Sequence, residues 1–196
     1  MNLNNIFNRA KNLLINPHIE WVRIESELST KQQVMKTYVI PFIILIAICS
    51  FIGASLLSVQ LIPMSVILTK TIIAGALLVG GVYLSAIIIN ELTTSFAIEK
   101  NFDATFKLVS YSFTSYFISS CLVGLLPDLL FLAILGLHSV YLFWLGTTHI
   151  LKAPETSKVG FVIVSFLIII GIYAILSLIV GTIAAGMLYV SNPISR

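Results

Sequence analysis

The chain has 196 residues, of which 58% are apolar and only 10% are charged, with a formal net charge of +3. A soluble domain carries about a quarter of its residues as charges, because charged side chains keep its surface hydrated. Eleven basic and eight acidic residues cannot cover a globular surface, which excludes a soluble fold. No basic block is present, so no nucleic-acid partner is expected.

The N-terminal 36 residues are predicted to form an amphipathic cytoplasmic segment. Apolar residues recur there at helical spacing, and Asn8, Arg9, Lys11 and Asn12 occupy the other positions. This helix would lie either on the membrane, with its cations near anionic lipid, or on the protein's own cytoplasmic face. The apolar positions are Leu3, Ile6, Phe7, Ala10, Leu13 and Leu14.

A second short helix is predicted to follow. Asn16 suits an N-cap and Pro17 suits a first helical position. Its apolar residues are Ile19, Trp21, Ile24 and Leu28. Thr30 and Gln33 have the spacing of a capping box at the start of the first membrane helix.

Five runs without a charged residue follow, each of 20 residues or more. A bilayer core about 30 Å thick needs about 20 apolar residues as a helix, whereas barrel strands are much shorter and alternate. The sequence therefore predicts an all-α fold, in which residues 37–196 form a bundle of five transmembrane helices. The expected spans are 38–59, 69–89, 108–126, 129–151 and 159–188.

Prolines and acids mark the ends of these runs. Pro41 is expected to kink the first span. Pro127 and Asp128 alone join the third and fourth spans, which predicts a tight hairpin with Asp128 as the cap of the fourth. Lys70, Glu91 and Asp128 are expected at the membrane interfaces, where a lysine can extend toward water.

The basic residues are unequally divided between the two sides of the membrane. Only Lys70 and Arg196 fall on one side, and the other nine basic residues fall on the side of the N-terminus. Because positive residues are retained in the cytoplasm, the N-terminus is predicted inside and the C-terminus outside. The nine are Arg9, Lys11, Arg23, Lys31, Lys36, Lys100, Lys107, Lys152 and Lys158.

Small residues recur at four-residue steps within the spans. Ser50, Ala54 and Ser58 form one such ridge, and Ser177, Gly181 and Ala185 form another. Ridges of this kind let helix backbones approach closely in lipid. They predict close packing, either within one bundle or between the copies of a homo-oligomer.

Few groups in the spans carry chemistry. His138 and His149 lie 11 residues apart, which is about 16.5 Å along a helix, so they cannot share a metal. No hydrolase, metalloprotease or phosphate-binding motif is present, and neither catalytic residues nor a cofactor is predicted. The third span is rich in hydroxyls, which line a pathway or form interhelical hydrogen bonds. The candidates for that polar role are His138, Tyr111, Ser112, Tyr116 and Asp128.

A second group of residues is predicted to contact lipid or a partner at the cytoplasmic face. Its members are cations close to the ends of the spans, together with one tryptophan. They are Arg9, Lys11, Trp21, Lys100, Lys107, Lys152 and Lys158.

Several short motifs, in order, resemble the membrane domain of the Yip family, the Ypt/Rab-interacting proteins, and in detail its prokaryotic branch. The resemblance covers about residues 6–185. The chain departs from the family pattern at three positions. Ser115 stands where the family has proline, and His138 and Phe161 each stand where it has tyrosine. The matching segments are Asn16-Pro17 with Glu20-Trp21, Lys100-Asn101-Phe102, Tyr111-Ser112 with Thr114, Gly136-Leu137 with Ser139 and Tyr141-Leu142, and Lys152, Pro154, Lys158 and Gly160.

The resemblance implies five membrane helices with a cytoplasmic N-terminus. Eukaryotic members bind small GTPases in early secretory membranes, a role that is not expected in a prokaryotic host. The leading interpretation is a non-enzymatic membrane-organising or scaffold protein of a prokaryotic cytoplasmic membrane. It would recruit other membrane proteins, or further copies of itself, through the N-terminal segment and residues Asn90–Lys107.

Two other interpretations remain open. One is a small homo-oligomeric transporter or channel lined by the third and fourth spans. The other is a membrane enzyme, which would require His138, Asp128 and Glu91 to come together in the fold.

Overall fold

The computed structural model describes residues 3–57 and 62–191, and every regular element in these ranges is helical. The predicted all-α class is thereby confirmed. The elements are α1 (Leu3–Ile15), α2 (Pro17–Ser26), α3 (Lys31–Val34), the π-helical turn η1 (Met35–Val39), α4 (Ile40–Leu57), α5 (Met64–Leu92), the 3₁₀ turn η2 (Thr93–Phe96), α6 (Phe102–Ser112), α7 (Thr114–Leu125), the 3₁₀ helix η3 (Pro127–Leu137), α8 (His138–Ile150) and α9 (Glu155–Ser191).

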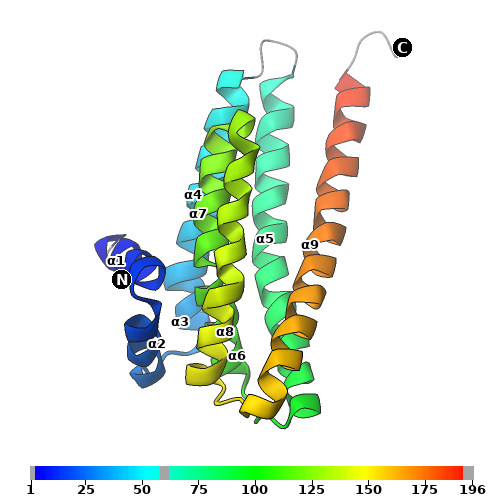
Figure 1. The fold of residues 1–196 in the computed structure, drawn as a ribbon. Helices are drawn as coiled ribbons and strands as arrows, with labels where there is room; N and C mark the ends of the chain where they lie inside the picture. The colour runs from blue at the N-terminus through cyan, green and yellow to red at the C-terminus, as the bar shows by residue number, and fades with distance from the viewer. Residues whose placement is uncertain (1–2, 58–61, 192–196) are drawn as a thin grey trace.

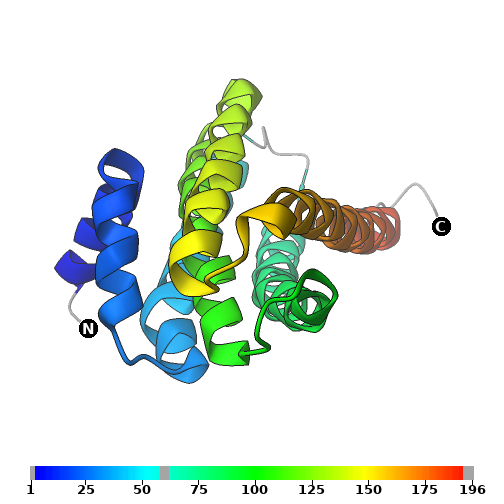
Figure 2. The ribbon, with the colours of Figure 1, turned by 60° about the horizontal axis from the view of Figure 1, so that its bottom comes forward.

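Four helices are long and apolar enough to cross a membrane, and the bent pair α6–α7 makes a fifth if it counts as one span. The long helices run side by side, with α1 and α2 against one flank and α9 at the opposite edge (Figures 1 and 2). The four are Lys31–Leu56, Met64–Phe96, Leu130–Ile150 and Glu155–Tyr189.

The first span begins at Lys31, earlier than the expected Tyr38. The predicted capping box is present, since the Thr30 hydroxyl accepts from the Gln33 N–H and the Gln33 side chain accepts from the Thr30 N–H. The π-helical turn η1 ends at Val39, two residues before Pro41. Proline lacks the N–H that a regular helix uses at this position, so the distortion lies one turn before Pro41. Ser58 and Val59, at the expected end of this span, fall outside the described residues.

The third expected span is not one continuous helix, because the chain bends by 40° at Phe113 between α6 and α7. Side-chain hydroxyls satisfy the backbone at the break. The Thr114 hydroxyl donates to the Tyr111 carbonyl at 2.5 Å, and the Tyr116 N–H donates to the Ser139 hydroxyl at 3.1 Å. The hydroxyl-rich composition of this span thus stabilises a broken helix.

The tight turn between the third and fourth spans is present, because α7 ends at Leu125 and η3 begins at Pro127. The fourth span then runs as a 3₁₀ helix to Leu137 before α8 begins. The cap predicted for Asp128 is wrong: Leu126 occupies the N-cap position and no side chain caps this helix. Asp128 itself is exposed.

The helices α4 and α7 approach each other closely. A Cβ on Gly53 would overlap the carbonyl oxygen of Gly124, and a Cβ on Gly124 would lie 2.5 Å from the Ser50 hydroxyl. Backbone therefore lies against backbone here, as small residues in membrane helices permit. Gly181, on the other predicted ridge, has no atom within 4 Å of a Cβ built on it.

Candidate interaction site at the N-terminal helices

The helices α1 and α2 are fixed to the bundle through one buried side each. Ile6, Ala10 and Leu13 of α1 are buried, as are Trp21 and Ile24 of α2. Four other apolar residues predicted for this segment, Phe7, Leu14, Ile19 and Leu28, are exposed. The N-terminal segment is therefore packed on the protein itself and still presents apolar side chains to its surroundings.

Trp21 anchors α2 to α8. Its indole lies so close to Gly146 that a Cβ there would be 2.6 Å from the ring. On its other side it meets the edge of Tyr111, with ring centroids 6.4 Å apart. A fully buried tryptophan contributes large apolar contact area, so this contact holds the N-terminal helices in one position.

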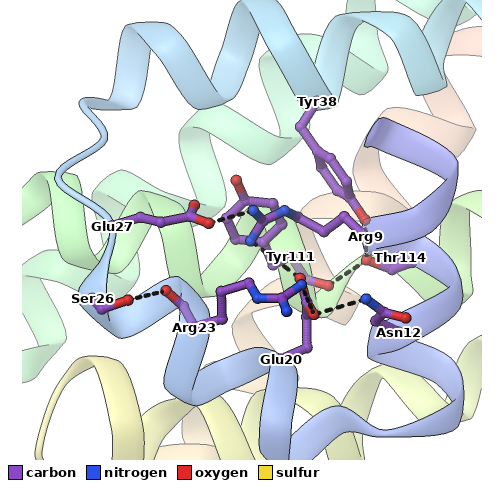
Figure 3. Close-up of polar contacts among 9 residues, drawn as sticks. All are labelled: Arg9, Asn12, Glu20, Arg23, Ser26, Glu27, Tyr38, Tyr111 and Thr114. Carbon is purple, nitrogen blue, oxygen red and sulfur yellow. Dashed lines mark hydrogen bonds and ion pairs between the residues drawn. The ribbon is translucent and has the colours of Figure 1, made fainter. Parts of the chain in front are cut away.

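A buried ionic cluster joins α1 to α2 (Figure 3). The Arg9 guanidinium donates to the Glu27 carboxylate at 2.5 Å and lies 3.4 Å from the Glu20 carboxylate. It also lies over the ring of Tyr111, 5.4 Å from its centroid. Glu20 is only 2% exposed and accepts a further hydrogen bond from the Asn12 amide at 3.1 Å.

Electrostatics in the cluster keep Arg9 charged. Burial alone lowers the pKa of Arg9, but the hydrogen bond to Glu27 and the negative charges of Glu27 and Glu20 offset that effect. The pKa of Arg9 is therefore raised above its ordinary value. A buried carboxylate needs such a partner, because an unpaired charge in the interior is strongly destabilising.

Further polar contacts tie the segment to the ends of the spans. The Lys107 ammonium donates to the Glu27 carbonyl at 2.6 Å, and the Lys31 N–H donates to the Asp103 carboxylate at 2.9 Å. Glu25 lies 3.7 Å from His149 at the end of α8. The segment is thus connected to α6 and α8 by side chains as well as by packing.

The seven residues predicted to contact lipid or a partner divide into two groups. Arg9, Trp21, Lys107 and Lys158 are engaged within the protein; the Lys158 ammonium lies 4.3 Å from the centre of the Trp144 ring. Lys11, Lys100 and Lys152 are exposed. Lys100 forms an exposed ion pair with Glu91 at 2.6 Å, and Lys152 lies 3.6 Å from Glu25.

Of the predicted polar residues of the third and fourth spans, His138 and Tyr116 lie close to the break in the third. His138 Nδ1 lies 2.8 Å from the Ser115 hydroxyl. Tyr116 packs on Tyr173 of α9, with centroids 5.5 Å apart. Tyr111 belongs to the N-terminal cluster instead, and the buried Ser112 hydroxyl has no hydrogen-bond partner in the described part of the chain.

Asp128 does not join His138, because η3 separates them by about 20 Å at the 3₁₀ rise of 2 Å per residue. Glu91 is paired with Lys100. The three residues that the enzyme interpretation requires are therefore not together. Residues 3–57 and 62–191 also contain no group of three His, Cys, Asp or Glu side chains able to hold a metal.

Glu20, Glu27 and Asn12 were not predicted as site residues. An acid in a short, mostly polar helix carries no local signal of burial, since the partner that buries it lies on another helix. The Asn-Pro-x-x-Glu-Trp segment contains both anchors of α2, Glu20 and Trp21.

The fold and this site define an α-helical integral membrane protein with a structured N-terminal segment docked on its bundle. A family model described as "Yip1 domain" matches residues 11–190. Because the match covers most of the chain, the protein belongs to the Yip1 domain family. No curated protein and no solved structure matches it.

Proposed function

We propose that this protein is a non-enzymatic scaffold that presents its N-terminal helices as a docking surface for another membrane-associated protein. The observation that carries the proposal is a set of exposed apolar side chains on rigidly anchored helices. Ile19 is 67% exposed and Val22 is 55% exposed on α2, and Leu28 is fully exposed after it. Exposed apolar groups near the ends of the spans are typical of interaction surfaces.

In the proposed arrangement, α1 lies at the inner boundary of the membrane. Ile6 and Phe7 line an apolar groove of about 240 Å³ with α4 residues, including Ile44 and Ile48. Ile44 and Ile48 are themselves exposed on a membrane helix and face lipid. In this arrangement Phe7 points toward acyl chains while Lys11 faces the headgroups.

Photo-crosslinking tests the docking surface. With benzoylphenylalanine at Val22 in native membranes, we expect a discrete protein adduct, because Val22 would lie in the interface. Ile163 is a matched control, since it is 56% exposed on α9, at the opposite edge of the bundle from α1 and α2. Lipid adducts alone at Val22, or the same protein band at both positions, would refute the docking proposal.

We also propose that the N-terminus is cytoplasmic and that the host membrane is a prokaryotic cytoplasmic membrane. The support is the charge distribution, because nine of the eleven basic residues precede or follow the spans on the side of the N-terminus. The alternative function, transport through the third and fourth spans, has no comparable support. The hydroxyls there hold the break in the third span or bond to His138.

Thiol labelling tests the orientation. In a variant with Cys49 and Cys121 replaced by alanine, an impermeant maleimide should label Ile62→Cys in intact cells and leave Lys11→Cys unlabelled. Both positions are exposed, so permeabilised cells should label at both. Labelling of Lys11→Cys in intact cells would reverse the proposed orientation.

A further inference from the structure

The depth of each residue in the bilayer follows from α4. Lys36 is exposed, and the 21 residues Thr37–Leu57 after it carry no charge. At 1.5 Å per residue they extend about 31 Å, which matches the hydrocarbon core. Thr37 is therefore taken as the inner boundary, and the outer boundary lies about 30 Å beyond it.

Lys70 lies well inside these boundaries. Gly75 of α5 is beside Ile43 of α4, since a Cβ on Gly75 would be 3.7 Å from the Ile43 side chain. Ile43 is about 9 Å beyond Thr37, and Lys70 is about 7 Å further along the antiparallel helix, at a depth of about 16 Å. An ionisable residue at such a depth pairs with another group or lines a functional site.

The Lys70 side chain lines a cleft of about 410 Å³ between α5 and α9, with Tyr116 of α7 at its base. The C-terminal half of α9 stands apart from α5 and η3 (Figure 1). Small residues line the α9 wall, and Gly181 has open space where a Cβ would lie. The Tyr173 hydroxyl at the base is buried and has no hydrogen-bond partner in the described ranges.

An acid is present on the neighbouring ridge, nearer the outer boundary than the Lys70 backbone. Gly124 packs on Gly53, which is about 24 Å beyond Thr37, and Asp128 follows Gly124 by about one turn. The flexible stem of Lys70 can extend toward that level. Neither residue forms an ion pair within residues 3–57 and 62–191. Below Asp128, η3 exposes a row of large apolar side chains: Leu130, Phe131 and Ile134, each 67–68% exposed.

We propose that the cleft receives η3 of a second copy of this chain, so that Lys70 pairs with Asp128 of the partner subunit. The charges are opposite, and the extended Lys70 stem would span the difference in depth between the two residues within the membrane. The small residues of α9 let the incoming backbone approach closely. A two-fold axis along the membrane normal makes the contact reciprocal, because the same surfaces are exchanged. This dimer is independent of the docking function of the N-terminal helices.

A charge exchange tests the pairing. In vesicles, Lys70→Asp alone or Asp128→Lys alone should lower the dimer association constant about tenfold. This change corresponds to a loss of about 1.4 kcal/mol in the free energy of association. The double variant should recover most of this loss, because the pair is restored with its charges reversed. Dimer fractions are measured by single-molecule photobleaching at several lipid-to-protein ratios. A double variant no better than the singles, or a monomer at every ratio, would overturn the proposal.

Cysteine pairing tests the geometry. In the background without Cys49 and Cys121, differently tagged Lys70→Cys and Asp128→Cys chains should form a disulfide-linked heterodimer on mild oxidation. Ile44→Cys, on the opposite flank, should not pair with Asp128→Cys. If Lys70→Asp instead removes a copurifying anionic lipid and leaves oligomerisation unchanged, the cleft is a lipid site and the dimer is refuted.

Discussion

Replacing Gly53 by alanine should lower the free energy of unfolding by about 3 kcal/mol, the upper range for overpacking in a close-packed interior. The added Cβ would overlap the Gly124 carbonyl oxygen and lie 2.8 Å from that of Leu125. Both are backbone atoms, so no side-chain rotation can relieve the overlap. We expect α4 and α7 to separate, with a lower thermal midpoint measured in detergent by tryptophan fluorescence.

Gly171→Ala is the matched control. Gly171 also lies within a membrane helix, but nothing lies within 4 Å of its Cβ position. Alanine has the higher helix propensity, so we expect no loss and a gain of up to about 1 kcal/mol. Equal effects of the two substitutions would show that the α4–α7 contact is not close-packed.

Replacing Arg9 by methionine should detach α1 and α2 from the bundle at a cost of about 3–5 kcal/mol, the range for removing one partner of a buried ion pair. The substitution leaves the Glu20 carboxylate, 2% exposed, without its buried cation. We expect faster amide hydrogen exchange throughout Leu3–Ile15 and Pro17–Ser26 while the spans stay protected. Hydrogen-exchange mass spectrometry in nanodiscs measures this directly.

Arg23→Met is the matched control, because Arg23 contacts the same Glu20 carboxylate from the surface. Its side chain is 59% exposed, and its ion pair at 3.4 Å is accessible to solvent. Exposed pairs contribute about 0–1 kcal/mol, so exchange should change little. Adding Glu20→Gln to Arg9→Met should restore part of the protection, since it removes the unpaired charge. Equal effects of the two arginine substitutions would contradict the ionic cluster.

These two predictions concern different requirements of the proposed scaffold. The α4–α7 contact maintains the bundle, whereas the Arg9 cluster fixes the position of the helices that would dock a partner. A docking surface loses affinity when it must first be ordered, because ordering costs conformational entropy. Arg9→Met should therefore weaken partner crosslinking at Val22 even though Arg9 is far less exposed than Val22.

The amino-acid sequence by itself determined the class of this protein. The bilayer explains both why charged residues are scarce and why the uncharged runs are so long, because each span must exclude charge over about 30 Å. Local signals were also sufficient for the Thr30–Gln33 cap and the turn at Pro127, since their causes lie within a few residues. The family resemblance agreed with both the composition and the helices.

Only the tertiary structure decided which polar residues act together. Arg9 was predicted to contact lipid or a partner, and in the structure it is buried against Glu20, because an acid on the next helix compensates its charge. The third span bends at Phe113, where hydroxyls from the chain and from α8 satisfy the freed backbone. Periodicity shows which side of a helix is apolar, but not which helix covers it. Such pairings depend on contacts between distant residues, and these are fixed only when the helices pack.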